Sequence, residues 1–377
     1  MSTKRGQQIT SKFILLLFFL MAVTSCTDNN SINIGFVGSI TGRNSELGVT
    51  ARNTLQLMVE EQNKNGGING KRLNLVIRDD MSSPAGAKAA ITNLIKKDVR
   101  LILGPITSAM AEPTTEAIAG RHVLVMSPTM STDFLANKDD NLLRTATGSS
   151  RQAETIAERA FSLGLGRTAV IGDMENPKYV NSIAQRFRTL VKQFGKEIPV
   201  EIKYSSSQNT NFNDIARKVA VKNPDSILFI TNGFDAAMLA QALRRAGLND
   251  ARFFGVSWSQ SNDIITHGGR AVEGMRLIAL HDYGNVDPKI AALKKKYIDR
   301  YNKEPSFIYT RYAAIFKIAV YGLEHAKSYN PNQIKRTILE KRNFNEFGRE
   351  IIFNRFGDAK EQYNLVIIKD GNFVSDN

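Results

Sequence analysis

Short apolar runs rich in β-branched residues alternate with helical patterns along most of this chain. In the helical patterns apolar residues recur at every third or fourth position, as Ala51, Leu55 and Val59 do. Parallel strands need a crossover between them, usually a helix, so this alternation predicts an α/β fold with parallel sheets. The expected strands are 32–38, 73–77, 101–103 and 123–126, followed by 168–171, 200–204 and 227–230.

The chain is long enough for two such units. A polar stretch, 146–150, separates the two series of strands. The 352 residues left after removal of the first 25 (377 − 25) exceed the roughly 100–200 residues of one domain. We therefore expect two α/β lobes in tandem. In open parallel sheets ligands bind beyond the carboxyl ends of the strands, so the loops after the strands are the candidate binding segments.

The N-terminus has the pattern of a secretory signal. Basic residues at Lys4, Arg5 and Lys12 precede an apolar run, 13–23, that is too short to span a membrane stably. Small residues and then Cys26, the only cysteine of the chain, follow this run. The arrangement resembles a bacterial lipobox, in which the cysteine thiol receives a diacylglycerol group.

The lipobox resemblance implies a signal peptide over residues 1–25 and a lipidated N-terminal tether over 26–31. A plain signal peptide and an uncleaved membrane anchor remain as alternatives. If Cys26 carries lipid, no disulfide can form within the chain, so the fold depends on its apolar core. We expect an exported protein that is anchored to a membrane and faces the periplasm or the cell exterior.

The charge balance is strongly basic, with 50 Lys and Arg residues against 36 Asp and Glu residues. Such a balance invites a nucleic-acid hypothesis. Here the cations are scattered over helical patterns or stand in short runs such as 294–296, and an exported chain rarely meets nucleic acid. We therefore expect a solvated surface that interacts with anionic lipid headgroups, and no nucleic-acid partner.

Sequence patterns typical of catalysis are missing. No Walker A or G-x-G-x-x-G loop is present. No paired metal-ligand spacing links the histidines, which are His122, His267, His281 and His325. The Asp79–Asp80 pair at a strand end could bind a metal or act in acid–base catalysis, but such residues more often cap the next helix. We expect no enzyme activity, no cofactor and no metal site.

Hydroxyl-bearing residues follow the third and fourth expected strands. Thr107 and Ser108 come after the third strand, and Thr129, Ser131 and Thr132 come after the fourth. Hydroxyls and free amides at helix N-termini can bind a carboxylate without a formal positive charge. The same residues are also common helix caps, and at this level both roles remain open.

Several short motifs occur in the order and at the intervals of one known family. They are Ile34–Gly42 with Leu47–Gly48, Gly66–Gly70, Asp79–Asp80 with Pro84, Gly104–Ser108, Met126–Pro128 and Val272–Met275. Together they make the chain similar to the branched-chain amino-acid binding proteins of ABC transporters, from Ile32 to beyond Tyr312. The resemblance implies the type I periplasmic binding protein fold, with two Rossmann-like lobes with parallel sheets joined by a three-segment hinge.

The same resemblance implies how the chain is divided between the lobes. Lobe 1 would consist of residues 32–147 and 277–350, and lobe 2 of residues 148–276 and 351–377. The three crossings would lie near 145–150, 273–280 and 350–353. Ligand would dock on lobe 1, and lobe 2 would then close over it by a hinge motion.

Ligand contacts in the first lobe follow from matching this chain to the family motifs. Ser108 matches a hydroxyl donor, Thr129 a residue that offers backbone groups, and Ser131 a second hydroxyl and amide. Leu47 falls where the family often has an aromatic residue at the pocket edge. The resemblance therefore implies a carboxylate clamp on lobe 1.

In the second lobe Tyr179 matches a tyrosine that closes over the ligand, and Phe234 lies near another such aromatic residue. One departure affects the ligand: where amino-acid binders of the family place an acid to pair with the ligand ammonium, this chain has Ser257 or Trp258. An unpaired ammonium in a closed cleft is costly. Asp235 could replace the missing acid; if it does not, we expect a carboxylate that lacks an amine, with Trp258 as an apolar wall or as inter-lobe packing.

The resemblance implies a solute-binding protein that captures a small carboxylate ligand for an ABC importer and works with its permease subunits. The ligand would be a branched-chain or other amino acid, or an amine-free organic or aromatic acid. A ligand-sensing receptor of the same fold that is not coupled to transport is the alternative. An enzyme built on a Rossmann-like unit is disfavoured because nucleophile, metal and cofactor motifs are missing.

Overall fold

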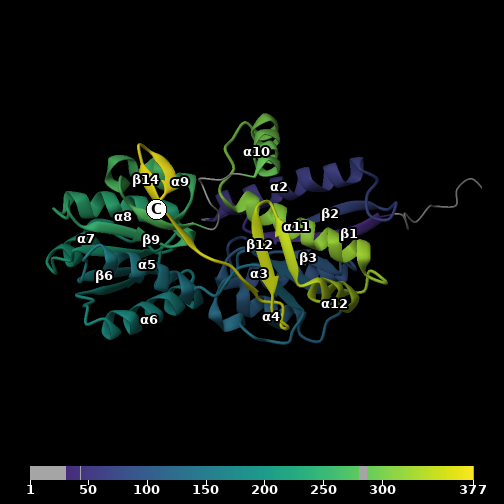
Figure 1. Cartoon of the computed structure of the whole chain (residues 1–377), viewed down its shortest axis with the longest axis horizontal. Helices are drawn as coiled ribbons and strands as arrows, with labels where there is room; N and C mark the ends of the chain where they lie inside the picture. Colours follow the sequence, from purple (N-terminus) through teal and green to yellow (C-terminus); the bar gives the residue numbers. More distant parts are fainter. Residues whose placement is uncertain (1–30, 43, 280–286, 377) are drawn as a thin grey trace, which may run out of the picture.

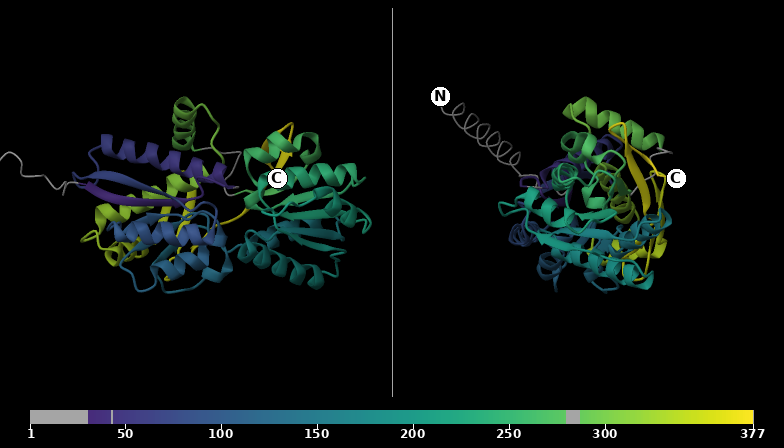
Figure 2. Two further views of the ribbon diagram at one scale, coloured as in Figure 1. Left: turned by 180° about the vertical axis from the view of Figure 1, so that it is seen from behind. Right: turned by 90° about the vertical axis from the view of Figure 1, so that its left-hand side faces the viewer.

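The structure is a computed structural model that describes residues 31–42, 44–279 and 287–376. The expected signal peptide, Cys26 and His281 lie outside these residues. In the described part, two α/β lobes lie side by side and the chain passes between them (Figure 1). Figure 2 shows from two further directions that each sheet is covered by helices, as the alternating pattern predicts.

The first lobe is built on a sheet that, within the described residues, has five parallel strands in the order β2-β1-β3-β4-β5. The strands are β1 (Ser31–Gly38), β2 (Arg72–Asp79), β3 (Leu101–Leu103), β4 (Leu124–Ser127) and β5 (Leu142–Arg144). The first four coincide closely with the expected runs. Their side chains are largely buried on both faces because helices cover both faces.

Helices on the two sides of this sheet enclose separate apolar clusters. One side carries α2 (Ser45–Lys64), α11 (Ile308–His325) and α12 (Pro331–Lys341), with α10 (Pro288–Tyr301) packed on α2. The other side carries α3 (Pro84–Lys96) and α4 (Ala111–Ile118), with the short helices η1 (Ser108–Met110) and η2 (Asp133–Leu135) at the strand ends. Two packed layers therefore hold the strand-end loops in place.

Ser83, rather than the Asp79–Asp80 pair, caps helix α3. Ser83 Oγ accepts the backbone amide of Gly86 (3.1 Å) at the helix N-terminus. Asp79 instead accepts the amide of Ile40 (2.9 Å) and so ties the loop after β1 to the loop after β2. Asp80 forms a local turn with its carboxylate. Both aspartates therefore stabilise turns, and the expected helix cap lies a few residues further on.

The second lobe has a sheet of seven strands over the described ranges, in the order β15-β14-β10-β9-β8-β6-β7. The strands are β6 (Thr168–Asp173), β7 (Glu201–Tyr204), β8 (Ser226–Ile230), β9 (Arg252–Gly255), β10 (Arg276–Ala279), β14 (Asn364–Lys369) and β15 (Asn372–Ser375). β6 to β10 run parallel, and the C-terminal hairpin β14–β15 adds antiparallel to β10.

Helices also cover both faces of the second sheet. One face carries α5 (Ser150–Ser162) and α6 (Pro177–Gln193). The other face carries α7 (Phe212–Ala220), α8 (Gly233–Arg245) and α9 (Asn262–Gly268), followed by η4 (Gly269–Val272). The short helix η3 (Ser257–Ser259) follows β9 at the edge that faces the first lobe.

The third crossing between the lobes lies later than expected. Residues 350–353 belong to β12 (Arg349–Phe353), which pairs antiparallel with β11 (Asn343–Glu346) and β13 (Ala359–Lys360). This small sheet packs with α11 of the first lobe, and the chain joins the second sheet only at Asn364. The expectation that lobe 2 begins again at 351 is therefore wrong for 351–360, because pairing with β11 holds this segment beside lobe 1. The remaining lobe limits stay predictions.

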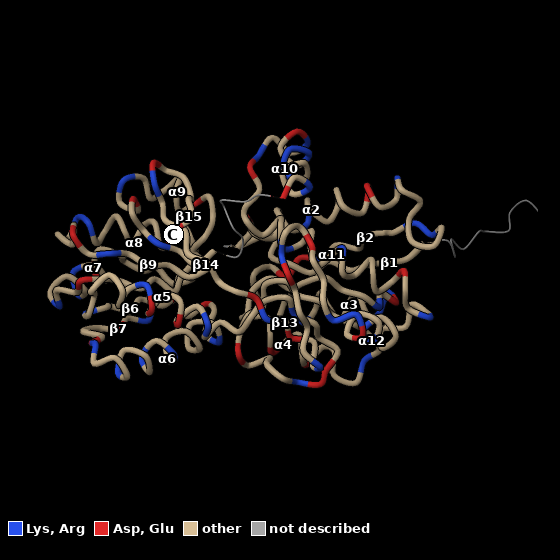
Figure 3. Tube along the Cα trace, in the orientation of Figure 1, with Lys and Arg blue, Asp and Glu red and all other residues tan. Residues whose placement is uncertain are grey.

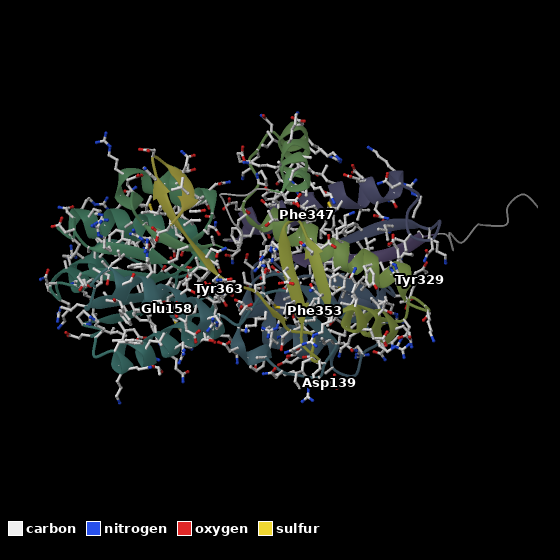
Figure 4. All side chains as sticks on the ribbon, viewed as in Figure 1. Asp139, Glu158, Tyr329, Phe347, Phe353 and Tyr363 are labelled. Carbon is white, nitrogen blue, oxygen red and sulfur yellow. The ribbon has the colours of Figure 1, made fainter. Side chains whose placement is uncertain are left out.

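Buried polar contacts join the crossings to each other and to the first lobe. Tyr363 Oη donates to the carbonyl oxygen of Thr147 (2.8 Å), which links the third crossing to the first. The Glu361 carboxylate pairs with the guanidinium groups of Arg311 and Arg349, and these side chains are 7%, 1% and 9% exposed. We call these three residues the hinge ion cluster. Figure 4 shows Tyr363 on the segment that runs between the lobes.

Basic and acidic residues are interspersed over the outer helices of both lobes (Figure 3). Many of them form exposed ion pairs, for example Lys88 with Glu116 and Lys296 with Glu61. In the ranges that the structure describes, no helix has the length and apolar character needed to cross a membrane.

Candidate ligand-binding site

A small cavity of about 50 Å³ lies between the two lobes, at the carboxyl ends of their parallel strands. The predicted site residues that line it are Leu47, Ser108, Thr129, Ser131, Tyr179, Ser257 and Trp258. Other residues that line it are Ile106, Thr107, Asn176, Phe307 and Ile308. Strand-end loops from both lobes therefore meet here, as the rule for open parallel sheets predicts.

A larger hollow of about 770 Å³ lies beside α10. Its lining mixes charges of both signs, such as Lys294 and Glu304, with aromatic residues such as Phe347. None of the predicted site residues lines it. We therefore place the candidate site in the smaller cavity, where polar groups from both lobes converge.

Ser108 holds the loop that follows β4. Its Oγ accepts the backbone amides of Ser131 (3.1 Å) and Thr132 (3.2 Å). Both lone pairs of this hydroxyl oxygen are thereby used, so the hydroxyl can interact with a ligand in the cavity only by donating its proton. The amide of Ser131 is engaged and is not the free donor that the resemblance implied, whereas its side chain lines the cavity. Ser108 thus has a structural role and can still donate to a ligand.

The two threonines of the first-lobe wall differ in their hydrogen bonds. Thr129 Oγ1 donates to the carbonyl oxygen of Ile106 (2.7 Å) and ties the two strand-end loops together. Thr107 Oγ1 is buried and has no hydrogen-bond partner. The Thr129 hydroxyl is therefore committed to the scaffold, and the Thr107 hydroxyl is available to a ligand.

Tyr179 lies in a polar network on the second-lobe wall. Its Oη donates to Gln152 Oε1 (3.0 Å) and lies 3.2 Å from Ser257 Oγ. The backbone amide of Ser257 donates to the same Gln152 oxygen (2.9 Å). Burial raises the pKa of Tyr179 to about 12, so the phenol is neutral. This network fixes the Tyr179 ring edge-on against Trp258, with ring centroids 6.1 Å apart.

Trp258 both lines the cavity and connects the lobes. Its Nε1 donates to Asn44 Oδ1 at the start of α2 (3.3 Å), and the residue is buried. The two roles weighed for Trp258, ligand wall and inter-lobe packing, are therefore combined in one side chain. The contact with Asn44 forms across the lobe boundary, so it belongs to the closed arrangement.

Three α-helices of the described part begin at the cavity. Leu47 is in the first turn of α2, Asn176 directly precedes α6, and Phe307 directly precedes α11. Helix N-termini carry partial positive charge, and among the described residues no Lys, Arg, Asp or Glu side chain lines the cavity. The cavity therefore favours an anion and disfavours a cation.

Two predicted site residues lie outside the cavity. Asp235 is fully buried, and its carboxylate accepts a hydrogen bond from Tyr204 Oη (2.8 Å). Phe234 is 40% exposed and packs edge-on against His267. The structure therefore does not bring Asp235 to the place where it could pair with a ligand ammonium. Within the described ranges, no group of three or more His, Cys, Asp or Glu residues could hold a metal ion.

Sequence reasoning missed several residues that line the cavity or support its wall. Pro177 marks a helix start after a strand, so the preceding Asn176 could have been identified as a strand-end residue. Gln152 supports the site through Tyr179 but belongs to α5, away from any strand end. Phe307 and Ile308 begin α11 of the first lobe, far along the chain from the other lobe 1 contacts. No local signal pointed to these last three.

A second cavity of about 20 Å³ adjoins the first and contains a partly buried acid. Leu47 and Trp258 line both cavities, whereas Glu46 and Asp263 line only the smaller one. Burial, and then the charge of Asp263 from the second lobe, raise the pKa of Glu46 to about 7; Lys303 and hydrogen bonds from the 261–262 segment partly oppose this. Oε1 of Glu46 is buried without a partner.

Closure of the lobes is expected to take up a proton at Glu46. With the lobes apart, its pKa would return toward the ordinary 4.5, so the closed form holds the proton more tightly. The stabilisation by that proton is full below pH 4.5 and is lost as the pH rises through 7. A ligand that binds to the closed form should therefore have up to about tenfold higher affinity at pH 6 than at pH 8.

Calorimetric titrations of wild type and Glu46→Gln at these two pH values check this expectation. The variant should lose most of the difference because it carries no titrating group at this position. An affinity in wild type that does not change with pH, or an equal change in both proteins, would contradict the role of Glu46.

Comparison of the sequence with known proteins identifies a family whose members bind ligands, in agreement with a cavity between two lobes. Residues 31–372 match the family model described as periplasmic binding protein. A leucine-, isoleucine-, valine-, threonine-, and alanine-binding protein from Pseudomonas aeruginosa is 25% identical over 363 residues, which cover 95% of each chain.

Solved structures are similar over most of their length. A branched-chain amino acid transporter substrate binding protein from Streptococcus pneumoniae, in complex with isoleucine, has a TM-score of 0.83 at 22% identity, covering 91% of this chain and 97% of that chain. An ABC transporter solute binding protein from R. palustris, in complex with benzoate, has a TM-score of 0.81 at 16% identity, covering 92% and 96%. The chain therefore belongs to the periplasmic binding protein family and is similar to its branched-chain amino-acid binding members.

Proposed function

We propose that this protein is an exported, lipid-anchored solute-binding protein that captures a small amine-free carboxylate for an ABC importer, and that it is not an enzyme. The observation that carries the proposal is the small cavity between the lobes, which is lined by hydroxyl groups and helix N-termini and, among the described residues, by no charged side chain. Such a surface can bind an anion by hydrogen bonds alone. The relatives are named as binding proteins, which supports capture rather than catalysis.

An ammonium group would lack a partner in this cavity. Asp235 is engaged by Tyr204 in the second lobe, and Glu46 lies in the adjoining cavity beyond Leu47 and Trp258. The partial positive charge of three helix N-termini would also repel a cation. The Pseudomonas relative is named for amino acids, and we propose that this chain differs from it by taking acids without an amine.

The size of the cavity supports a compact ligand. Its volume of about 50 Å³ is small, so a compact acid fits it better than a bulky one. The R. palustris protein holds benzoate, and an acid of that size would require the two lobes of this chain to sit farther apart. We therefore expect short aliphatic acids to bind more tightly than aromatic acids.

Thermal-shift screening tests the proposal. The protein without residues 1–25 would be heated with amino acids, aromatic acids and short aliphatic acids, each in large excess. A ligand at 100 times its dissociation constant stabilises the folded state by about 2.7 kcal/mol, which is a readily measured shift. Stabilisation by short aliphatic acids supports the proposal. Stabilisation by amino acids alone would contradict the amine-free ligand.

The lipid anchor has its own test at Cys26, which lies outside the described residues. Cys26→Ser should move the protein from the membrane fraction to the soluble fraction, because a serine hydroxyl cannot accept the thioether-linked lipid. Cell fractionation followed by immunodetection measures this, with Ser25→Ala as a control that keeps the thiol. Unchanged membrane association of Cys26→Ser would contradict lipidation at this residue.

A further inference from the structure

Two polar side chains that line the cavity have buried atoms without a hydrogen-bond partner. They are Thr107, 6% exposed with Oγ1 unpartnered, and Asn176, 4% exposed with Oδ1 unpartnered. Thr107 follows β3 of the first lobe, and Asn176 precedes α6 of the second, so they approach the cavity from opposite lobes. Buried polar atoms are nearly always paired in proteins, so these two indicate a polar group that the ligand supplies.

Neither residue is explained by a local structural role. Asn176 occupies the N-cap position of α6, yet its side chain makes no cap hydrogen bond. The Thr107 hydroxyl likewise makes no bond to η1, the helix that it precedes. By contrast, the neighbouring Thr129 has a structural role, because its hydroxyl donates to the carbonyl oxygen of Ile106. The contrast assigns Thr107 and Asn176 to ligand recognition.

The hydrogen-bonding properties of these two atoms restrict which functional group of a ligand can bind to them. Asn176 Oδ1 is an acceptor, so the ligand must offer a donor, whereas the Thr107 hydroxyl can donate or accept. A ligand ammonium donates, but it would add a cation beside the helix N-termini with no acid to pair with it. A ligand hydroxyl satisfies both residues, because it can accept from Thr107 and donate to Asn176 without bringing charge.

We propose that the ligand is a short hydroxycarboxylate, whose carboxylate is bound by the hydroxyls of Ser108 and Ser131 and whose hydroxyl group bridges Thr107 and Asn176. The inference rests on the proposed function and narrows its ligand class. Because Asn176 belongs to the second lobe, its bond to the ligand hydroxyl forms only as the lobes close. The hydroxyl group therefore links recognition to closure.

Matched acids that differ in one substituent test this inference. The first series is propionate, lactate and alanine, and the second is isovalerate, 2-hydroxyisovalerate and valine. Butyrate with 3-hydroxybutyrate covers a hydroxyl one carbon further from the carboxylate. In calorimetric titrations of the protein without residues 1–25, at least one hydroxy acid should bind about tenfold or more tightly than both its deoxy and its amino counterpart.

Variants of the two residues complete the test. Thr107→Val and Asn176→Ala should each reduce the preference for the hydroxy acid over the deoxy acid to about threefold or less, with little change in affinity for the deoxy acid. Thr107→Val keeps the side-chain shape and removes only an unpartnered hydroxyl, so its folding should survive. Thr189→Val, which makes the same change at an exposed position of α6 outside the cavity, is the matched control and should retain the preference.

The possible results separate this inference from the proposed function. Deoxy acids that bind as tightly as hydroxy acids, or a preference that persists in both variants, would contradict the recognition of a ligand hydroxyl group. The proposed binding of a carboxylate would not be affected. If alanine or valine binds most tightly, the proposal of a ligand without an amine is contradicted, and the hydroxycarboxylate inference with it. Absence of binding by every acid to folded protein would overturn the proposed function itself.

Discussion

Replacing Glu361 by glutamine is expected to lower the free energy of unfolding by about 3–5 kcal/mol, because it leaves two buried guanidinium groups without a compensating charge. Arg311 is 1% exposed, and burial together with the charge of Arg349 lowers its pKa to about 10 even beside Glu361. Several guanidinium nitrogens of both arginines already lack partners. A loss of this size is a large fraction of the roughly 5–15 kcal/mol that stabilises a folded protein.

Urea unfolding followed by the fluorescence of Trp258, the only tryptophan, measures this change. The control is Glu340→Gln, which removes an exposed partner of Arg336 and should cost less than about 1 kcal/mol. If Glu361→Gln and Glu340→Gln have the same small effect, the hinge ion cluster does not stabilise the fold as argued. Because Glu361 lies in the third crossing, the same variant should also change how readily the lobes close.

Removing both serine hydroxyls of the first-lobe wall is expected to weaken ligand binding by about a hundredfold or more. A hydrogen bond to a charged partner contributes roughly 1.5–3 kcal/mol, so each of Ser108→Ala and Ser131→Ala should cost about tenfold to hundredfold in affinity. The two changes differ in their structural cost. Ser131→Ala leaves its amide bonded to Ser108, whereas Ser108→Ala leaves two amides unpaired.

The unfolding free energy separates ligand contact from scaffold damage. Ser108→Ala should lower it by about 1–3 kcal/mol and Ser131→Ala by much less, since the Ser108 hydroxyl accepts two amides. Ser162→Ala removes an exposed hydroxyl far from the cavity and should change neither property. A Ser131→Ala protein with normal stability and weakened binding would show that its hydroxyl contacts the ligand.

The alternating pattern of strands and helices predicted the fold because each strand or helix depends on residues that are close together in the sequence. Each strand of the first sheet except β5 was visible as a short apolar run, and the parallel order follows from the helices between strands. The third crossing could not be located in this way. Whether 350–353 crosses to the other lobe or pairs with β11 depends on antiparallel contacts made after α12, which apolar spacing does not encode.

The candidate site was predictable where it follows strand ends. Ser108 and Ser131 reach the cavity from neighbouring parallel strands, whose ends necessarily lie at one edge of the sheet. Asp235 also follows a strand, yet Tyr204 on an adjacent segment holds its carboxylate, and only the packed structure shows that. Phe307 enters from the N-terminus of α11, so its place depends on how the whole first lobe assembles.

Calorimetric titration of wild type and the Ser108→Ala/Ser131→Ala double variant, using the acid that gives the largest thermal shift in the screen, tests whether the two serine hydroxyls bind the ligand carboxylate. Circular dichroism and urea unfolding would first establish that the variant is folded. We expect one bound acid per wild-type protein and no measurable binding by the folded double variant. Wild-type affinity in the folded double variant would contradict it, because the two hydroxyls would then be scaffold groups and the carboxylate would bind elsewhere.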